Sequence, residues 1–252
     1  MKPSVGIWPC LNRDAIKAIA MATMLLNHIA NALLSPQSPW FEPLVNIGYF
    51  TAVTMCYFLA EGYGYTRNRK AYALRLLVFA LISQIPYWLA LGIFQLNMLF
   101  TLLVCLGTAH VAHEMATRPG ERLGRNFAAL LGLFFVSLFM DWGTMAPLFT
   151  FIFCSWRYGK LGLGGRRSGL ALVFLGDALI FFFQSLPAEW TAQAMLHTAA
   201  STLGILVAGA VILLFYNGKR AGHGRTFWKW FFYLFYPAHL AVLAAIKLLV
   251  LQ

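Results

Sequence analysis

FLAEGYGYTRNRK, residues 58–70, joins the end of an apolar run to a group of cations. The run ends at Glu61, and Arg67, Arg69 and Lys70 follow closely. An apolar stretch that stops at a basic loop is typical of a membrane-spanning helix. Of the 252 residues, 60% are hydrophobic and only 11% are charged, against about 25% charged in soluble domains. The sequence therefore predicts an all-α polytopic membrane protein.

About nine transmembrane helices, within a range of roughly eight to ten, are expected from the apolar runs. We place them at residues 14–34, 45–65, 74–94, 96–116, 126–140, 143–156, 168–186, 195–216 and 228–250. The loops between them are short and no internal repeat is visible, so the sequence predicts one transmembrane domain over residues 1–252.

Every second connection between the expected spans is basic. The alternate connections, around Gln37, Leu96, Asp141 and Glu189, contain no Lys or Arg, and of the 19 basic residues only Lys247 falls on their side. Because Lys and Arg in short loops stay in the cytoplasm, the N-terminus is predicted to be cytoplasmic and the C-terminus to lie outside. The basic connections contain Arg67, Arg69, Lys70 and Arg75, then Arg118, Arg122 and Arg125, then Arg157, Lys160, Arg166 and Arg167, and finally Lys219, Arg220 and Arg225.

Residues 126–156 form the least regular part of this pattern. The segment is basic at both ends, so it crosses the membrane twice or not at all. Each half, on either side of Asp141 and Trp142, has about 15 residues, or roughly 22 Å of helix. We expect two short helices that turn around a buried polar corner, because irregular backbone at membrane depth must be covered by protein.

The net charge of +11 is explained by these basic loops, so we expect no nucleic acid partner. The four cysteines, Cys10, Cys56, Cys105 and Cys154, are scattered, and three of them lie within apolar runs. This spacing fits neither a disulfide framework nor a metal site, and no metal is expected.

The first expected span carries a polar stripe. Its members are three or four residues apart and therefore share one helix face. They are Asp14, Lys17, Met21, Met24, His28 and Asn31. Lys17 lies near the cytoplasmic end and His28 lies roughly 16 Å further along. Ionisable side chains within a span face a bundle interior or a cavity. His28 is thus a candidate base, although a structural hydrogen bond to a neighbouring helix would also explain it.

Glu61 is expected at the cytoplasmic surface, where it can pair with Arg75 or Arg67 and hold the following loop. Arg and Lys at such a mouth suit a polyanionic ligand such as a nucleotide diphosphate, since guanidinium groups match phosphate bidentately. Ordinary positive-inside residues with a structural Glu61 are the alternative interpretation.

Further candidates lie in later spans. Asp177 stands in the middle of an apolar run, where it must be paired or protonated. His239 follows Tyr236 and a proline that frees a backbone carbonyl within a kinked helix. Asn97 and Asp141 complete this set.

Five segments along the chain carry a family resemblance. They are AIKAIAMATMLLNHI (15–29), YFLAEGYGYTRNRKAYALRLLVFALISQIPY (57–87), LNMLFTLLVCLG (96–107), FMDWGTMAPL (139–148) and KWFFYLFYPAHL (229–240). Together they resemble the TraX family, membrane proteins linked to N-acetylation of F-pilin in conjugation. That family is similar to the transmembrane acyltransferase superfamily, which includes the acyltransferase-3 family and the lysosomal heparan-α-glucosaminide N-acetyltransferase.

The superfamily carries an Arg or Lys in its first span, then ten residues, then a His, and Lys17 and His28 fit that spacing. The resemblance implies that His28 is the catalytic base. It also implies that the basic residues after the second span handle the phosphates of acyl-CoA, namely Arg67, Arg69, Lys70 and Arg75. TraX relatives often have Asp before this His, where the present chain has Asn27, an amide that would orient an imidazole less strongly.

The resemblance implies a multi-pass acetyltransferase of the bacterial inner membrane. Acetyl-CoA would be the cytoplasmic acyl donor, and a pilin N-terminus or another extracytoplasmic amine or hydroxyl would be the acceptor. His28 would act as base, with Asn31, Asn97 or a tyrosine hydroxyl such as Tyr236 as oxyanion donors.

Three alternatives stay open. The acceptor could be an envelope glycan or lipid, or the chain could be a non-catalytic partner of a pilus system. It could also be a small-molecule or proton-coupled transporter that uses His28, Asp177 and His239.

Overall fold

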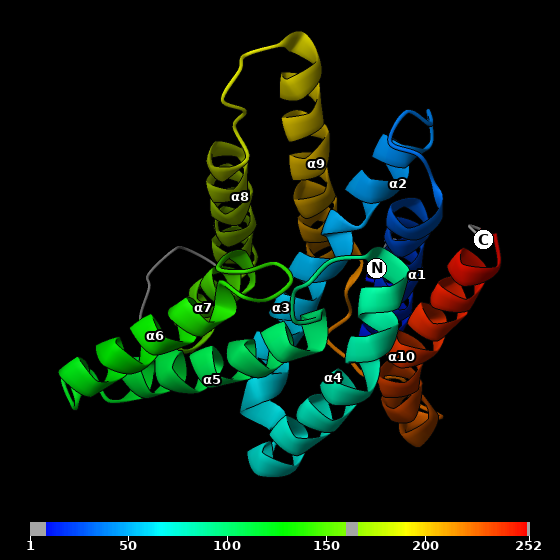
Figure 1. Ribbon diagram of the computed structural model, residues 1–252. Helices are drawn as coiled ribbons and strands as arrows, with labels where there is room; N and C mark the ends of the chain where they lie inside the picture. Colours follow the sequence, from blue (N-terminus) through cyan, green and yellow to red (C-terminus); the bar gives the residue numbers. More distant parts are fainter. Residues whose placement is uncertain (1–8, 160–165, 251–252) are drawn as a thin grey trace, which may run out of the picture.

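The structure is a computed structural model that describes residues 9–159 and 166–250, and these residues form a bundle of α-helices without a β-strand (Figure 1). The helices are α1 (Arg13–Leu33), α2 (Phe41–Ile47), α3 (Tyr49–Tyr65), α4 (Arg69–Leu91), α5 (Met98–Thr117), α6 (Leu123–Ser137), α7 (Met145–Tyr158), α8 (Arg166–Gln184), α9 (Ala192–Phe215) and α10 (Arg225–Val250). The predicted all-α fold is confirmed.

Seven helical segments of the described residues are long and apolar enough to cross a membrane. They are α1, α2 together with α3, α4, α5, α8 from Arg167, α9 and α10. The chain is therefore a multi-pass membrane protein. Each of the nine expected spans corresponds to a helix, and α6 and α7 are the two short ones, with 15 and 14 residues.

The second expected span is broken at Gly48, where α2 ends and α3 begins. A Cβ atom on Gly48 would lie 2.5 Å from Cβ of Asn27 on α1, so only glycine allows α1 to pack this closely against the break. The side chain of Asn27 also donates to the backbone oxygen of Val45 at 2.8 Å. The break therefore fixes α2 against α1.

Polar side chains define where several of the helices begin. The side chains of Asn12, Asn68, Asn97 and Thr191 accept hydrogen bonds from the first backbone N–H groups of α1, α4, α5 and α9. These N–H groups have no partner within their own helix, and in lipid an unsatisfied donor is especially costly.

The connection between α6 and α7 turns sharply, and Trp142 adopts a positive φ of 62°. The turn is held by α5 and the loop before it. The N–H of Asp141 donates to the backbone oxygen of Leu96 at 2.8 Å, and Thr101 donates its hydroxyl to the backbone oxygen of Asp141 at 2.6 Å. Two short helices around a polar corner were expected, although Asp141 is only half-buried.

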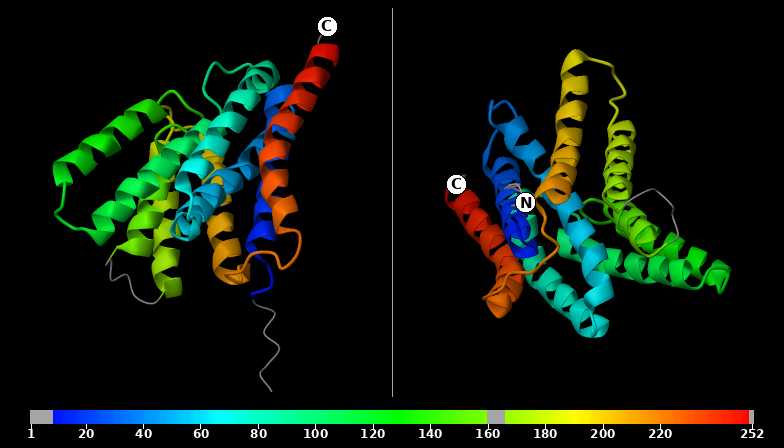
Figure 2. Two further views of the ribbon diagram at one scale, coloured as in Figure 1. Left: turned by 90° about the horizontal axis from the view of Figure 1, so that it is seen from below. Right: turned by 180° about the vertical axis from the view of Figure 1, so that it is seen from behind.

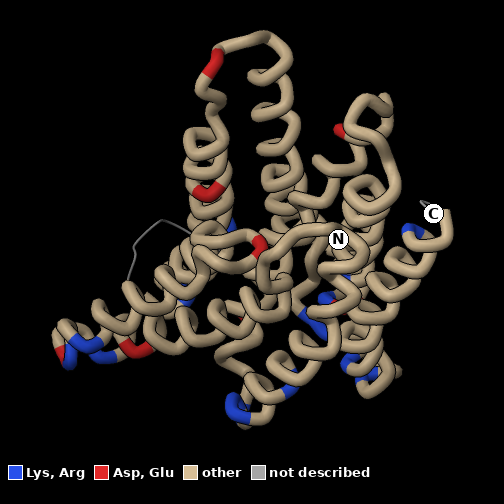
Figure 3. The backbone as a smooth tube through the Cα atoms, in the orientation of Figure 1, with Lys and Arg blue, Asp and Glu red and all other residues tan. Residues whose placement is uncertain are grey.

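Helices α1, α3, α4, α5 and α10 pack around a common interior, while α8 and α9 stand together on the other side of α3 (Figures 1 and 2). Lys and Arg gather towards the lower end of the view in Figure 3, and the tall upper ends carry acidic residues instead. We call the lower end the basic end, and the positive-inside rule assigns it to the cytoplasm.

Candidate active site

Two cavities lie end to end within the bundle. The inner cavity, at the basic end, has a volume of about 330 Å³, and the outer cavity has about 230 Å³. Helices α1, α3, α4, α5 and α10 line both cavities. On α3, Met55 lines the inner cavity and Ala52 lines the outer one. On α10, Tyr233 lines the inner cavity and Tyr236 lines the outer one. Three helical residues rise about 5 Å, so a thin wall separates the two spaces.

The polar stripe of α1 runs along both cavities. Asp14 and Lys17 line the inner cavity, whereas Met24, His28 and Asn31 line the outer one. Met21, 3% exposed, belongs to neither lining and lies between them. One helix face thus connects a cation near the basic end with an imidazole deep in the bundle.

The inner cavity is strongly basic. Six cations line it against one described acid, Asp14: Arg13, Lys17, Arg75, Arg220, Arg225 and Lys229. Lys17 and Arg75 were predicted from the sequence as functional residues, whereas Arg220 and Arg225 were assigned only to a basic connection between spans. Arg13 and Lys229 were not predicted as functional residues.

Backbone pairing explains this convergence. The N–H of Leu11 donates to the oxygen of Phe215, the N–H of Asn217 donates back to the oxygen of Leu11, and the N–H of Arg13 donates to the oxygen of Lys219. These bonds fasten the start of α1 to the α9–α10 connection. The one available signal for Arg13 was its position one turn before Lys17.

Several of these cations are held in place by aromatic rings and carbonyl oxygens. The ammonium of Lys17 lies 3.8 Å from the ring centroid of Phe232, and Arg13 donates to the oxygen of Phe58 at 2.8 Å. The guanidinium of Arg75 lies 5.9 Å from the ring centroid of Tyr233, while its Nε is buried and has no acceptor among the described residues. Buried donors without an acceptor are uncommon in folded proteins.

Asp14, expected as a catalytic residue, accepts a hydrogen bond from the N–H of Ala221 at 2.8 Å. The carboxylate thus ties α1 to the loop that carries Arg220 and Arg225. Its observed contact is structural, although it lies at the inner cavity.

Arg67, Arg69 and Lys70 line a separate surface hollow, which meets the inner cavity at Tyr65 and Thr66. Of the four cations expected to bind the donor, Arg75 is thus the one that lines the inner cavity itself. The guanidinium of Arg69 lies 4.0 Å from the ring centroid of Tyr63.

Glu61 was expected to pair with Arg75 or Arg67, and the structure shows a different partner. Its carboxylate is 7% exposed and accepts a hydrogen bond from the hydroxyl of Tyr216 at 2.8 Å. No ion pair joins Glu61 to either arginine in the described part of the chain. The reason is that Glu61 faces the α9–α10 connection rather than the loop after α3.

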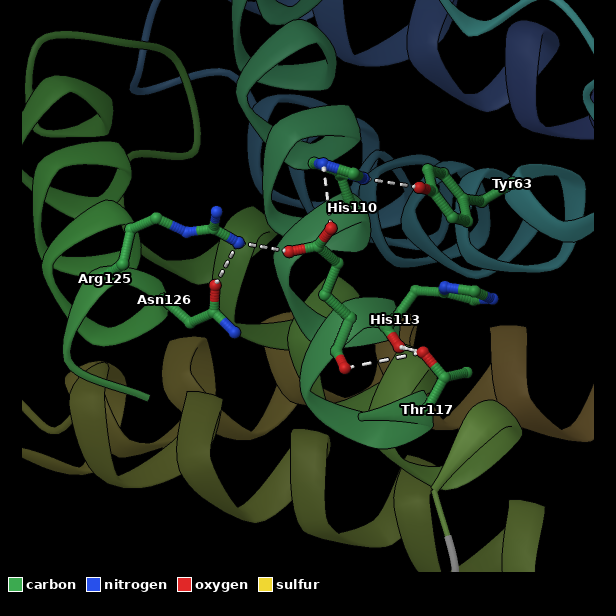
Figure 4. Close-up of polar contacts among 7 residues, drawn as sticks. Tyr63, His110, His113, Thr117, Arg125 and Asn126 are labelled. Carbon is green, nitrogen blue, oxygen red and sulfur yellow. Dashed lines mark hydrogen bonds and ion pairs between the residues drawn. The ribbon is translucent and has the colours of Figure 1, made fainter. Parts of the chain in front are cut away.

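Figure 4 shows how α3, α5 and α6 are connected near the basic end. The hydroxyl of Tyr63 lies 2.9 Å from Nδ1 of His110. One turn further along α5, Glu114 forms a 2.7 Å ion pair with Arg125. These contacts brace the wall outside the cavities, and His110 lines neither cavity.

In the outer cavity, His28 pairs with a second histidine. Its Nδ1 lies 2.8 Å from Nε2 of His239 on α10, and the ring centroids are 5.1 Å apart with an interplanar angle of 9°, so the two rings are nearly coplanar. Nδ1 of His239 lies 2.7 Å from the backbone oxygen of Phe235. Both rings are buried, with 6% and 7% exposure.

This geometry fixes the tautomers when both rings are neutral. A carbonyl oxygen only accepts hydrogen bonds, so Nδ1 of His239 carries the proton and its Nε2 accepts. His28 must then donate from Nδ1, which leaves its Nε2 with a free lone pair. Among the described residues Nε2 of His28 has no hydrogen-bond partner. His28 is thus prepared to accept a proton.

Asn27 does not orient the imidazole of His28. Its side chain bonds to Val45, and Asn31 donates to its backbone and side-chain oxygens. His239 is the partner of the ring instead. The hydrogen bond that a carboxylate before His28 would form is therefore formed by His239 on α10, more than 200 positions away in sequence.

Tyr236 and Asp141 also line the outer cavity. The hydroxyl of Tyr236 accepts from the N–H of Met98 at 3.3 Å, so its own O–H is available to a ligand. Its ring packs edge-on against His28 at 6.2 Å. Tyr236 is therefore the best placed of the oxyanion donors considered from the sequence.

Two expected residues lie elsewhere. Asn97 is fully buried and engaged at the start of α5, where it bonds to Leu99, Ala80 and Gln84. Asp177 is fully buried on α8 outside both cavities, and neither of its carboxylate oxygens has a hydrogen-bond partner among the described residues.

No group of three His, Cys, Asp or Glu side chains in the described ranges is arranged to hold a metal ion.

Comparisons with known proteins agree with the resemblance noted in the sequence. The chain is 29% identical over 247 residues to the probable fimbrial assembly protein FimC, serogroup H1, of Dichelobacter nodosus, covering 92% of this chain and 94% of the relative. No solved structure matches it significantly. The model of the TraX protein family matches residues 12–247. Because this match covers nearly the whole chain, the protein belongs to the TraX family.

Proposed function

We propose that the protein is a membrane-embedded acetyltransferase. It takes an acetyl group from cytoplasmic acetyl-CoA and passes it to an amine or hydroxyl at the extracytoplasmic side. The observation that carries the proposal is the alignment of the inner cavity, lined by six cations, with the outer cavity that contains His28.

The inner cavity matches the donor. Acetyl-CoA is polyanionic at its nucleotide end, and phosphates cannot enter hydrocarbon. Arg side chains bind phosphate bidentately, and the buried Nε of Arg75 lacks an acceptor among the described residues. The nucleotide would stay at the basic end, while the slender, uncharged pantetheine arm extends along the α1 stripe towards the wall at Met21.

The outer cavity contains the groups that the proposed transfer step needs, a proton acceptor at His28 and a hydrogen-bond donor at Tyr236. The acceptor nitrogen or oxygen attacks the thioester carbon while Nε2 of His28 takes its proton, and Tyr236 donates to the developing oxyanion. His239 accepts from Nδ1 of His28 throughout. Collapse of the intermediate breaks the carbon–sulfur bond, and the coenzyme A thiolate takes the proton back from His28. One N–C or O–C bond has then replaced one C–S bond.

The acceptor proposed for this chain is a pilin amino terminus. The family resemblance and the fimbrial assembly protein among its relatives both support a pilin-directed role. In the proposed orientation, the acceptor side faces the extracytoplasmic side of a bacterial inner membrane, where such a terminus would be exposed.

The test uses the purified protein in liposomes with acetyl-CoA on the side of the inner cavity. A peptide with a free amino terminus, added to the opposite side, should gain one acetyl group by mass spectrometry. The His28→Ala protein is the matched control and should transfer about 10²- to 10⁴-fold more slowly while it keeps its melting temperature.

Acetyl-CoA should also raise the melting temperature of the detergent-solubilised protein, whereas acetate should not, because acetate lacks the phosphates that the inner cavity recognises. A protein that neither binds acetyl-CoA at millimolar concentration nor acetylates any acceptor would end this proposal.

A further inference from the structure

A further hollow lies on the outside of the bundle, away from the two cavities and from the surface hollow beside the inner one. This lateral groove has a volume of about 1120 Å³ and runs between α1, α2 and α9. Its wall on α9 extends from Thr191 to Val211. Twenty residues of helix measure about 30 Å, which equals the thickness of the hydrocarbon core of a membrane.

The groove has the shape and surface of a site for a helix. Its lining along α9 repeats every three or four residues, at Ala194, His197, Ala200, Gly204, Val207 and Val211. Part of this face is packed within the molecule, since Gly204 lies against Asn46 and Tyr49 where α2 meets α3. Leu196, Leu203 and Val207 on the groove wall are exposed and leave room for a partner. Small residues on such a face allow another helix to approach closely. A single phospholipid reaches across only one leaflet, about half of this length.

The end of the groove that lies opposite the basic end is polar and acidic. Glu42 on α2 lies there, with Nδ1 of His197 at 2.5 Å from its Oε2. Asn46, one turn further along α2, is 9% exposed, and its Oδ1 is buried without a partner among the described residues. Its Nδ2 is 3.5 Å from the same Oε2 of Glu42.

The accessible acceptor at this end is the carboxylate of Glu42, whose side chain is 53% exposed, and an ammonium group can donate to it. Among the described residues that line the groove there is no Lys or Arg. An aminophospholipid would bring a phosphate beside its amine, and that phosphate would find no cation there. A peptide amino terminus brings the positive charge alone.

We infer that the lateral groove binds an apolar transmembrane helix of a partner protein whose free amino terminus lies at the outer surface against Glu42. The inference deepens the proposed function and rests on it for one point, that the partner is the acceptor of the acetyl group. The opposite face of α2, at Val45, lines the outer cavity that holds His28.

An amine captured at Glu42 is separated from the outer cavity by the thickness of one helix, about 10 Å. Three or four extended residues at the start of the partner reach across that distance. The groove holds the membrane segment while its amino end moves over α2 to His28.

The experiment measures binding to the full-length protein in nanodiscs. The probe is a synthetic leucine–alanine helix of about 20 residues, long enough to span the bilayer, with a free amino terminus and a fluorophore at the other end. Its N-acetylated form is the second probe. We expect the free amine to bind about fivefold more tightly, the scale of an exposed ion pair.

Glu42→Gln should remove this preference, whereas Val207→Trp should fill the groove and weaken both probes by tenfold or more. Leu206→Trp is the matched control, because Leu206 is exposed on α9 but does not line the groove. His197→Ala gives a second variant at the polar end and should strengthen the preference, since it removes a competing donor from Glu42.

Equal effects of Val207→Trp and Leu206→Trp would overturn the inference, as would equal affinity for the two probes. Displacement of the probe by phosphatidylethanolamine at matched concentration would assign the groove to lipid and overturn it too.

The binding assay needs no acetyl-CoA, so the two proposals can fail separately. Groove binding without any acetyl transfer would contradict the proposed function alone. Transfer that depends on His28, with no probe bound in the groove, would contradict this inference alone.

Discussion

The inner and outer cavities share the same helices but differ in almost everything else. The inner cavity has six cations on its wall, drawn from α1, α4, α10 and the connection before α10. The outer cavity has no Lys or Arg among its described lining residues and presents a histidine, amides and tyrosines.

On the proposed function, this difference would separate recognition of the donor from the transfer step. A charged nucleotide needs cations close to water, because isolated charges within hydrocarbon are costly. A proton acceptor needs a neutral imidazole in a dry and fixed setting. One helix face, that of α1, supplies Lys17 to the first site and His28 to the second, roughly 16 Å apart.

The largest effect is expected when the proposed base, His28, is removed from the outer cavity while the inner cavity is left intact. His28→Ala should lower kcat for acetyl transfer by about 10²- to 10⁴-fold, the usual contribution of a positioned acid–base group. Binding of acetyl-CoA, measured by the shift in melting temperature, should be unchanged because the inner cavity is intact.

His110→Ala is a matched control for this experiment. His110 bonds to Tyr63 and lines neither cavity, so its loss should leave transfer nearly unaffected. Full activity of the His28→Ala protein would remove the outer cavity from the mechanism.

The stripe on α1 could be predicted because helical spacing alone decides which residues share a face. The same is true of the spans and of the basic connections, which follow from apolar length and charge. The break at Gly48 was not predicted, since an apolar run continues through it, and the close approach of Asn27 that requires glycine there is a contact between two helices.

The partner of His28 could not be read from the sequence either. His239 was noted for its proline, but no pattern within one segment shows that it reaches a ring on α1. The partner of Glu61 was wrong for the same reason. Local sequence pointed to Arg67 and Arg75, whereas the fold brings Tyr216 closer.

The second prediction tests His239 as a positioning residue. His239→Ala should lower kcat by about 10- to 100-fold with little change in KM for acetyl-CoA, because the ring of His28 loses the acceptor that fixes its tautomer. The pH profile of kcat should change as well, since His28 would titrate without its hydrogen-bonded neighbour.

His239→Gln offers a control, because a glutamine oxygen can accept from Nδ1 of His28 and should restore part of the activity. The double variant of His28 and His239 should be no slower than His28→Ala alone. Independent, multiplicative losses would contradict a shared pathway through His28.

The third prediction tests whether the inner cavity binds the acetyl-CoA donor. Arg75→Ala should raise KM for acetyl-CoA by about tenfold or more, as expected for a lost hydrogen bond to a charged group. The joint change of Arg67→Ala and Arg69→Ala should also raise KM, but by less, because both line the hollow beside the inner cavity.

Steady-state kinetics at varied acetyl-CoA would separate these cases. A fall in kcat at constant KM for Arg75→Ala would mean that Arg75 acts on the transition state rather than on the donor. A larger effect of the Arg67 and Arg69 pair would move the donor site from the inner cavity to the outer rim.

The smallest expected effect concerns the wall between the cavities. Met21 is buried between the inner and outer linings of α1, so its side chain limits what passes from one space to the other. Met21→Ala should raise the ratio of kcat/KM for propionyl-CoA over acetyl-CoA by about fivefold, the lower end of the roughly 1–3 kcal/mol that one methylene is worth in an apolar pocket.

Leu33→Ala is the control for this change, since Leu33 is exposed at the far end of the same helix. If Met21→Ala instead slowed both donors equally, the methionine would be packing the bundle rather than limiting the acyl group. If kcat/KM rose for propionyl-CoA alone, the acyl group would pass the wall at Met21 during transfer. The separation of the inner cavity from the outer cavity would then depend on this one side chain.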